Sequence, residues 1–506
     1  MNAIINWGVL TASLLFGLQA AASPITTTLR IKERVSMQQL AENVKNPASD
    51  HFGRFYTPEE IREVSAPSNE NYQGVIDSLK AQGLTIVSES TTHLWITVRG
   101  EQSIYENLFA TKVETLSNGS RKQLSAVRIP FYLSMIQGVT GLDNTRKAHP
   151  HYIKQASNMF PGGVAPSTIR TAYGFDSIYA SGLTAKGIDI AIATYDSFNI
   201  ENARQYYALS NISPIPSVDL VEFNGTAKYD ENSAAETELD AEFSGMIAVG
   251  ANIHVFTSAA NSDAGELQMY TAILDDNRAK VVNYSWGSCE TSVTPQHKAE
   301  MDPVFSRAAA QGVNITVASG DSGSDSCQDR TVKADWPSAH PSVVSVGGTT
   351  LSTSGGKLSE TGWNGSGGGI SDLWDLPAYQ KSLGAPYLKR SYPDVSFNAD
   401  PRSGQAIYTG APGRGQWMIV GGTSMAAPQW AGFLALVGAA RKAAGKADVG
   451  FINPIIYGMD AATRAKTFHD VVSGSNGAYS AAVGWDAVTG FGSMQADALL
   501  NYFKAL

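Results

Sequence analysis

The sequence predicts an α/β protein in which a parallel sheet is covered by helices on both faces and is preceded by a small α+β domain. Short runs rich in Val, Ile and Ala, bounded by turn residues and separated by helical stretches, predict the sheet. Strands buried on both faces of a parallel sheet have this composition. The runs cover residues 188–194, 252–256, 280–284, 313–318 and 343–346.

The small domain is predicted within residues 23–160, where the spacing of apolar residues changes from helical to alternating and back to helical. Residues 149–166 carry Pro, Gly and Ser between two patterned regions, as a linker or a cleavage segment does. Net charge also separates the two parts, since residues 23–160 carry +2 and residues 161–506 carry −11. The three apolar groups are Val75, Ile76 and Leu79, then Leu94, Ile96 and Val98, then Ile104, Leu108 and Phe109.

The composition excludes several classes of protein. With 506 residues, of which 43% are hydrophobic and 16% charged, the chain is too apolar to be disordered. The net charge of −9 and the absence of a basic patch exclude a nucleic-acid binder. Two cysteines are too few for a disulfide scaffold, although one bridge is possible.

The first 22 residues contain no charged side chain and end in the small residues Ala20 to Ala22, which predicts a secretory signal peptide cut near Ala22. An uncleaved anchor is the alternative, because no positive charge precedes the apolar stretch. The longest later apolar run, residues 433–440, is too short to span a bilayer. We therefore expect a secreted protein, extracellular or periplasmic, with no membrane contact after the leader is removed.

Ser424 is the candidate nucleophile. It follows two glycines in Gly-Gly-Thr-Ser-Met-Ala-Ala-Pro and precedes an Ala-rich helix that runs to about Ala444. A serine in the first turn of a buried helix can expose its hydroxyl while its own N–H points at a bound carbonyl oxygen. The alternative is a serine that only caps the helix.

A serine hydroxyl needs a general base, and none of the eight histidines stands in a His-Gly helix-start motif. His254 lies inside an apolar strand, where a structural histidine is expected. The histidines are His51, His93, His149, His151, His254, His297, His340 and His469.

Two acids are better candidates for the base. In the predicted helix of residues 236–247, Glu236 and Asp240 fall within the apolar stripe, about 40° apart, and Glu238 falls on the opposite face. Two acids on the buried side repel each other and lose hydration, so they indicate a functional dyad. Chance or a buried ion pair is the alternative.

Asp321 is a third candidate acid. It stands in Ser-Gly-Asp-Ser-Gly directly after a predicted strand, at the end where active sites of parallel sheets lie. If burial keeps it protonated, it can donate a hydrogen bond to a developing oxyanion. A simple turn aspartate is the alternative.

These motifs, in this order, resemble the sedolisin family of serine-carboxyl peptidases, in particular its bacterial pro-enzymes. The resemblance implies a subtilisin-like doubly wound parallel sheet and a ferredoxin-like pro-domain, since residues 51–111 look like the activation segment and residues 165–173 like the mature start. It implies a division into signal peptide (1–22), activation pro-domain with linker (23–160) and peptidase domain (161–506).

The resemblance also implies roles for single residues. Ser424 is then the nucleophile, Glu236 the base, Asp240 its carboxylate partner and Asp321 the oxyanion donor. Asp196, at the end of a strand, extends the acid network. The strand that flanks the substrate comprises Ser285, Trp286 and Gly287.

One Ca²⁺ is implied near the C-terminus, where carboxylates and free carbonyls supply the hard oxygen ligands that it prefers. Two surface turns with acids are the alternative. Ala482 stands where the family has glycine. The implied ligands are the side chains of Asp470 and Asp486 and the backbone oxygens of Val471, Ala482 and Gly484.

Export and a count of two cysteines predict a disulfide between Cys289 and Cys327, with two buried thiols as the alternative.

The expected function is a secreted serine-carboxyl endopeptidase that acts on proteins or peptides and has an acid optimum of roughly pH 3 to 5, because carboxylates rather than imidazole do the acid–base work. We expect a monomer made as a pro-enzyme, with an inhibitory pro-domain that is released and autoprocessed on acidification. The alternatives are a tripeptidyl-peptidase of the same family, a histidine-dependent peptidase of neutral optimum, and a non-catalytic binding protein of the same fold.

Overall fold

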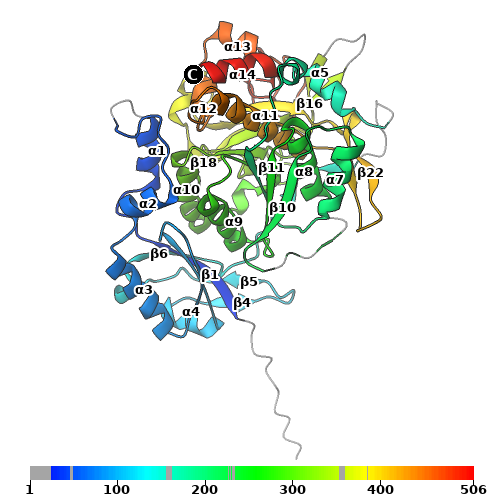
Figure 1. Ribbon diagram of the computed structural model, residues 1–506. Coiled ribbons are helices and arrows are strands. Elements are labelled where there is room, and N and C mark those ends of the chain that lie inside the picture. The colour runs from blue at the N-terminus through cyan, green and yellow to red at the C-terminus, as the bar shows by residue number, and fades with distance from the viewer. Residues whose placement is uncertain are drawn as a thin grey trace, which may run out of the picture.

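The computed structural model describes residues 24–45, 49–154, 162–225, 227, 229–230, 234–352, 359–384 and 386–506. The predicted signal peptide lies outside the described residues, as does part of the predicted linker. The described chain forms a small domain and a large domain that pack against each other (Figure 1). Within these ranges, no helix has the length and apolar character needed to cross a bilayer.

An eight-stranded parallel sheet forms the centre of the large domain, which confirms the predicted fold class. Two further strands pair antiparallel with it, β17 (Ser359–Gly362) with β16 and β23 (Phe468–His469) with β24. The parallel strands lie in the spatial order β10 (Ser217–Glu222), β11 (Asn252–Thr257), β9 (Asp189–Thr194), β12 (Val281–Tyr284), β14 (Asn314–Ala318), β16 (Val344–Ser352), β20 (Val395–Asn398) and β24 (Ser493–Met494).

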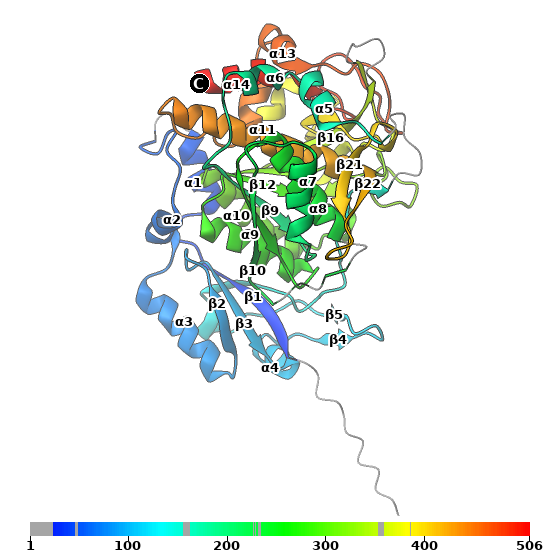
Figure 2. The same cartoon turned by 45° about the vertical axis from the view of Figure 1, so that its right-hand side comes forward.

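Helices cover both faces of this sheet, as Figure 2 shows. On one face α8 (Ala234–Ile247) packs along α11 (Thr423–Ala443), and on the other α9 (Asp263–Asp276) packs along α10 (Pro295–Ala310). The first pair approaches closely at Gly432 of α11, where any side chain would overlap Ser244 and Ile247 of α8. This close approach brings the acids of α8 near the start of α11.

The small domain has the βαββαβ topology of a ferredoxin-like fold. Its four-stranded antiparallel sheet has the order β2-β3-β1-β6, and its helices are the two predicted from the apolar spacing. The elements are β1 (Ile25–Ile31), α3 (Asn69–Ala81), β2 (Thr85–Glu89), β3 (Trp95–Gly100), α4 (Gln102–Leu108) and β6 (Ile136–Thr140).

Two more helices of the N-terminal part, α1 (Met37–Lys45) and α2 (Pro58–Ser65), leave this domain and lie against the large one (Figure 1). α1 packs on α10, and Met37 and Leu40 are fully buried in the apolar core that also contains the large sheet. The ferredoxin-like sheet has a separate core. The two domains are therefore joined by an apolar contact as well as by the chain.

The remaining elements form edges and connections. They are β4 (Val113–Thr115), β5 (Arg121–Gln123), β7 (His149–Pro150), β8 (Ile153–Lys154), α5 (Pro166–Ala172), α6 (Asp176–Ala180), α7 (Ile200–Leu209), β13 (Trp286–Cys289), β15 (Asp335–Trp336), β18 (Gly369–Asp375), β19 (Lys389–Tyr392), β21 (Gln405–Thr409), β22 (Gln416–Gly421), α12 (Asn453–Gly458), α13 (Ala461–Thr467) and α14 (Ala496–Ala505), with short 3-10 turns between some of them.

Candidate active site

Ser424 lies buried in the first turn of α11. The residue that caps this helix is Gly422, whose φ of 109° suits glycine, so Ser424 is not the cap. The backbone N–H of Ser424 donates to the carbonyl oxygen of His151 at 2.9 Å, and its hydroxyl donates to the carbonyl oxygen of Ser285 at 3.3 Å. The start of α11 thus presents both a hydroxyl and an N–H to the segments that contain His151 and Ser285.

Glu236 and Asp240 lie on the side of α8 that faces α11, and both are fully buried. The hydroxyl of Ser285 donates to Oδ1 of Asp240 at 2.6 Å. Burial raises the pKa of both carboxyls well above the usual range, and the charge of Asp240 raises the pKa of Glu236 further. Among the residues that the structure describes, neither oxygen of Glu236 has a hydrogen-bond partner of ordinary geometry, yet the Ser424 hydroxyl lies close enough to lower its pKa. The two carboxyls therefore form a pair that favours holding one proton in common.

The opposite face of α8 is also buried, because α7 and β21 cover it. The helix is therefore not exposed to solvent on one side, as a surface helix would be. Glu238, on that face, accepts a hydrogen bond from the Asn202 side chain at 2.7 Å, and Glu242 accepts one from the backbone N–H of Tyr408 at 3.0 Å. Burial raises the pKa of Glu238 to about 7. These two acids point away from α11 and have their own partners.

Asp321 lies in the loop after β14, beside the start of α11. Its Oδ1 accepts hydrogen bonds from the backbone N–H of Thr423 at 2.7 Å and from the Thr423 hydroxyl at 2.9 Å. Its Oδ2 is buried and has no hydrogen-bond partner among the described residues. Burial raises the pKa of Asp321 to about 6, so this carboxyl is protonated in acid and can donate from its free oxygen.

Three histidines of the large domain are held by carboxylates remote from Ser424. The ring nitrogens of His254 lie 2.6 Å from Asp219 and 2.9 Å from Asp189, as expected of a structural histidine. His297 contacts Glu266 at 2.9 Å, and His340 contacts Asp302 at 3.2 Å.

The linker, rather than solvent, faces Ser424. β7 pairs antiparallel with β13, so that His149 lies opposite Gly287 and Pro150 opposite Trp286. The N–H of His151 then donates to the carbonyl oxygen of Ser285 at 3.0 Å. Beyond Ser424, β8 pairs with the end of β22, with Ile153 opposite Gly421. The segment 149–154 therefore crosses the site as an extended strand, hydrogen-bonded on both sides of the serine.

The other residues predicted around the site lie close to it. Trp286 is buried and its indole N–H donates to the Thr194 hydroxyl at 3.2 Å. Asp196 follows β9, and its charge contributes to the raised pKa of Glu236. Cys289 and Cys327 are joined by a disulfide with a Cα–Cα distance of 4.7 Å, which ties β13 to the loop after Asp321.

Residues that pattern reasoning missed also line the site. Asp335 lies behind Gly287, Thr423 holds Asp321, and Asn283 donates to the hydroxyl of Ser285 at 3.0 Å. Asp335 and Thr423 act through contacts with segments far away in the sequence, which no local spacing reveals. Asn283 acts on Ser285 two residues further along the chain, but it stands inside an apolar strand, where nothing marks it as a site residue.

The predicted calcium segment brings Asp470 and Asp486 to the same loop. The N–H of Gly484 donates to Asp470 at 2.9 Å, and the N–H of Ala482 donates to Asp486 at 3.0 Å. No group of three or more acidic, imidazole or thiol side chains gathers as a metal site in the described part of the chain. Both carboxylates thus accept backbone N–H groups from residues 482–484, and carboxylate oxygen is a ligand type that a hard cation takes.

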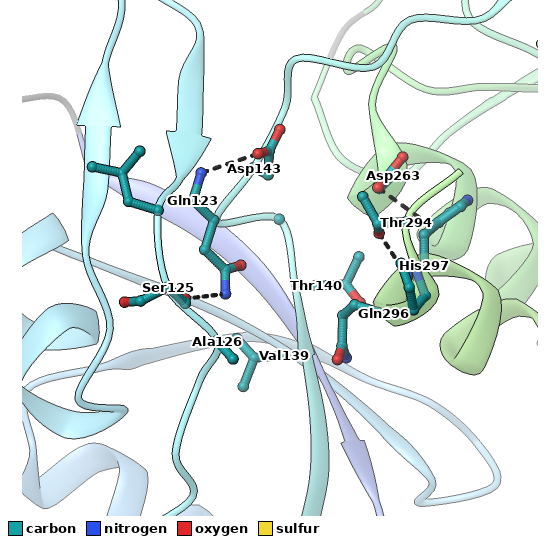
Figure 3. A pocket seen from close by; sticks show the side chains of 13 residues that line it. Gln123, Ser125, Ala126, Val139, Thr140, Asp143, Asp263, Thr294, Gln296 and His297 are labelled. Carbon is teal, nitrogen blue, oxygen red and sulfur yellow. Dashed lines mark hydrogen bonds and ion pairs between the residues drawn. The ribbon is translucent and has the colours of Figure 1, made fainter. Parts of the chain in front are cut away.

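A cavity of about 260 Å³ lies at the junction of the two domains and is separate from Ser424 (Figure 3). Gln123 and Asp143 line it from the small domain, and Asp263 and His297 from the large one. It is a gap in the interface and contains none of the predicted catalytic side chains.

Comparisons with known families match two parts of the chain. Residues 19–145 match the family described as "Pro-kumamolisin, activation domain", and residues 224–483 match the "Subtilase family".

Three known proteins are similar over most of their length. Kumamolisin of Bacillus sp. (strain MN-32) is 34% identical, over 74% of this chain and 71% of that protein. Sedolisin of Pseudomonas sp. (strain 101) is 29% identical, over 95% of this chain and 87% of that protein. Tripeptidyl-peptidase 1 of Canis lupus familiaris is 25% identical, over 94% of this chain and 91% of that protein.

A solved structure of Pseudomonas sedolisin, complexed with two molecules of pseudo-iodotyrostatin, superimposes with a TM-score of 0.61 at 31% identity. The match covers 68% of this chain and 99% of that one.

Proposed function

Because the chain belongs to the sedolisin family of serine-type peptidases, we propose that it is an exported serine-carboxyl endopeptidase that works in acid and matures by cutting itself. Residues 1–22 are its signal peptide, residues 23–160 its pro-domain and linker, and residues 161–506 its peptidase domain. Its substrates are peptides and proteins, and its first ligand is its own pro-domain.

The burial of Glu236 beside Ser424 carries this proposal. The Glu236 carboxyl is fully buried and close to the Ser424 hydroxyl, and it has no other hydrogen-bond partner in the described part of the chain. Such a group is costly unless it has a function. Asp240 shares its charge and is oriented by Ser285. The structural histidines His254, His297 and His340 are engaged elsewhere.

The reaction is acyl transfer to water. Ser424 Oγ attacks the substrate carbonyl carbon while the Glu236–Asp240 pair takes the hydroxyl proton, and this proton passes to the leaving amine as the C–N bond breaks. Water then attacks the acyl-enzyme with the same pair as base. The Ser424 N–H and the protonated Asp321 stabilise the oxyanion in both steps.

Acid activity follows from two titrations. The pair must hold one proton rather than two, which sets the acid limit. Asp321 must keep its proton, and since its pKa is about 6, activity falls as the pH rises through 6.

A calcium ion near the C-terminus belongs to the proposal. Asp470 and Asp486 would hold it together with the backbone oxygens of Val471, Ala482 and Gly484. The ion would supply positive charge that offsets the repulsion between the two carboxylates.

The test compares variants of the base and of a matched acid. Glu236→Gln and Ser424→Ala should lower the hydrolysis of an unfolded protein at pH 4 by at least a thousandfold, because the base or nucleophile is lost. Glu238→Gln is the control on the same helix. Its carboxyl has a pKa of about 7 and is protonated at pH 4, so an amide imitates it and activity should remain within threefold.

Activity that survives Glu236→Gln, or that is maximal at pH 8, contradicts the proposal. Absence of hydrolysis by the wild type at every pH favours a binding protein.

A tripeptidyl-peptidase is the second candidate, because one of the similar proteins has that name. The linker is hydrogen-bonded on both sides of Ser424, which supports a cleft open at both ends and hence endopeptidase action. A peptide with an acetylated N-terminus distinguishes the two, since only an endopeptidase cuts it internally.

A further inference from the structure

Strand β22 forms a hairpin with β21 beside α7 and α8, as Figure 2 shows, and it carries an exposed tryptophan. Trp417 is 48% exposed, whereas every other tryptophan within the described ranges is at most 8% exposed. The rings of Tyr206 and Tyr408 contact it edge-to-face, with centroid distances of 5.9 and 5.3 Å. Trp417 is therefore held in one orientation while much of its surface faces solvent, which lowers the entropy cost of binding a ligand there.

The hairpin partner of Trp417 is fixed by a glycine. Tyr408 lies opposite Trp417 in the ladder of β21 and β22. A Cβ on Gly415 would overlap the ring of Tyr408, so this ring lies directly against the hairpin backbone. β21 thus occupies one edge of β22, and the other edge is the one with which β8 pairs beside Ser424.

This second edge of β22 extends beyond its pairing with β8. β8 pairs with the last two residues of the strand, with Ile153 opposite Gly421. The strand begins at Gln416, and Trp417 precedes Gly421 by four residues. Because the pairing is antiparallel, a chain that continues in this register reaches Trp417 four residues after the residue opposite Gly421.

A bound residue opposite Trp417 places its side chain against the indole ring. Side chains alternate between the two faces of a strand, so Trp417 and Ile419 share the face of Gly421. Gln416 lies on the other face. Residues directly opposite each other in an antiparallel pair have side chains on the same face, with Cβ atoms about 4.5 to 5.5 Å apart. Trp417 is then flanked by Tyr408 on one side and by the bound residue on the other.

We propose that β22 extends the substrate site on the amine side of the cleaved bond, and that Trp417 selects an apolar, preferably aromatic, side chain at the sixth residue after that bond. This rests on the proposed peptidase function. The count follows from Ser424, whose N–H contacts the carbonyl oxygen of His151 at 2.9 Å. A substrate carbonyl in that place precedes the cleaved bond, so the residue opposite Gly421 is the second after the bond and the residue opposite Trp417 is the sixth.

The occupant of this edge is the extended amine-side part of a peptide or of an unfolded protein. The backbone of β22 pairs with any sequence, and Trp417 adds a preference for one side chain. The contact is remote from Ser424 and does not change during the reaction, so it should lower KM and leave kcat unchanged. Neither an indole nor an apolar side chain ionises in acid, so the preference should be the same at pH 3 and pH 5.

The experiment uses three peptides with one common scissile bond, which a digest of a random peptide library by the matured wild type identifies first. The short peptide ends at the third residue after the bond. The two long peptides continue to the eighth residue and differ only at the sixth, which is phenylalanine in one and serine in the other. Mass spectrometry confirms that all three are cut at the same bond.

For the wild type, kcat/KM should be about fivefold higher with phenylalanine than with serine, which is the effect of one aromatic contact, and the difference should lie in KM. In Trp417→Ala this ratio should fall below about twofold. The short peptide does not reach Trp417, so its kcat/KM in this variant should stay within about twofold of the wild type.

Two further variants serve as controls. Trp417→Phe retains a ring and should keep a ratio above about twofold. Gln416→Ala changes the exposed neighbour on the other face of β22 and should keep the wild-type ratio.

The outcomes separate this proposal from the proposed function. Equal kcat/KM of the wild type for the two long peptides overturns the role of Trp417 and leaves the peptidase intact. Equal losses on the short and long peptides in Trp417→Ala also overturn it, because the tryptophan then only supports the hairpin. If no peptide of the library is cut in a Ser424-dependent way, the proposed function itself fails.

Discussion

Among single residues, Asp321 combines one hydrogen-bonded carboxyl oxygen with one that has no hydrogen-bond partner within the described ranges. Oδ1 accepts two hydrogen bonds from Thr423, and these fix the carboxyl so that Oδ2 is available to a substrate. Only the protonated form can donate from Oδ2, so in the proposed mechanism the ionisation of Asp321 sets the alkaline limit of activity.

Asp321→Asn should remove that limit. An amide keeps an acceptor for Thr423 and donates from its nitrogen at every pH. We expect a lower maximal rate but no loss of kcat between pH 5 and 7, a range over which the wild type declines. Initial rates on one peptide across pH 3 to 8 measure this.

Asp321→Ala, which removes the donor, should cost about 10²- to 10³-fold in kcat at pH 4. An alkaline limit that stays near pH 6 in Asp321→Asn assigns it to another group.

A site residue can be predicted from the sequence when a local pattern of neighbouring residues marks it. Glu236 and Asp240 are predicted because helical periodicity is local, and Asp321 because it directly follows a strand. Asp335 and His151 are not predicted, because their contact joins segments 184 residues apart. The burial of Glu238 is not predicted either, because Asn202 and β21, which cover it, lie in distant parts of the chain.

At the level of elements, the same reasoning explains which strands are predicted. The five predicted strands are apolar runs in the middle of the sheet. β10 is partly exposed at the sheet edge, β20 carries the polar residues Ser396 and Asn398 among its four residues, and β24 has two residues, too few for a pattern. The spatial order of the strands in the sheet depends on how the connecting helices pack, and the sequence of a single strand does not contain that information.

The loop between Asp470 and Asp486 carries a prediction of its own. Bound calcium stabilises the folded state by about 2.7 kcal/mol when its concentration is a hundred times Kd. Addition of calcium should raise the melting temperature of the wild type, and a chelator should reverse the rise. Differential scanning calorimetry at pH 6 measures both.

In Asp470→Asn and Asp486→Asn the melting temperature should not respond to calcium. Magnesium is the control ion and should have a smaller effect, because it prefers a tighter octahedral shell. A wild-type melting temperature that is indifferent to calcium removes the ion from the proposal.

For the whole molecule, the contact between domains contains a buried charge network. Arg146, which precedes the linker strand, reaches Asp263 at 2.5 Å and also contacts Glu266. The pKa of Glu266 is lowered to about 2, because Arg146 and His297 outweigh its burial. Stability of the contact is therefore fully present above the ordinary pKa of a glutamate, about 4.3, and is lost as the pH falls toward 2.

Arg146→Gln should weaken the contact between the domains at pH 6, where the contact is strongest because Glu266 is ionised. Removal of one partner from a buried ion pair costs about 3 kcal/mol or more, so the cut pro-domain should dissociate roughly a hundredfold more readily at pH 6. Its release should also depend less on pH. Sedimentation velocity of the cut protein over a series of pH values from about 2.5 to 6, which spans the ionisation of Glu266, measures the bound fraction.

Arg128→Gln, an exposed arginine of the same domain, is the control. Equal retention of the pro-domain by wild type and Arg146→Gln assigns the pH response to other groups.

The packing of α1 on α10 separates cleavage of the linker from release of the pro-domain. A cut in the linker leaves Met37 and Leu40 inside the shared core, so the severed piece stays seated. Cleavage of the linker and dissociation of the pro-domain are then separate steps with different rates. Cleaved molecules stay inactive until the apolar packing of α1 is lost.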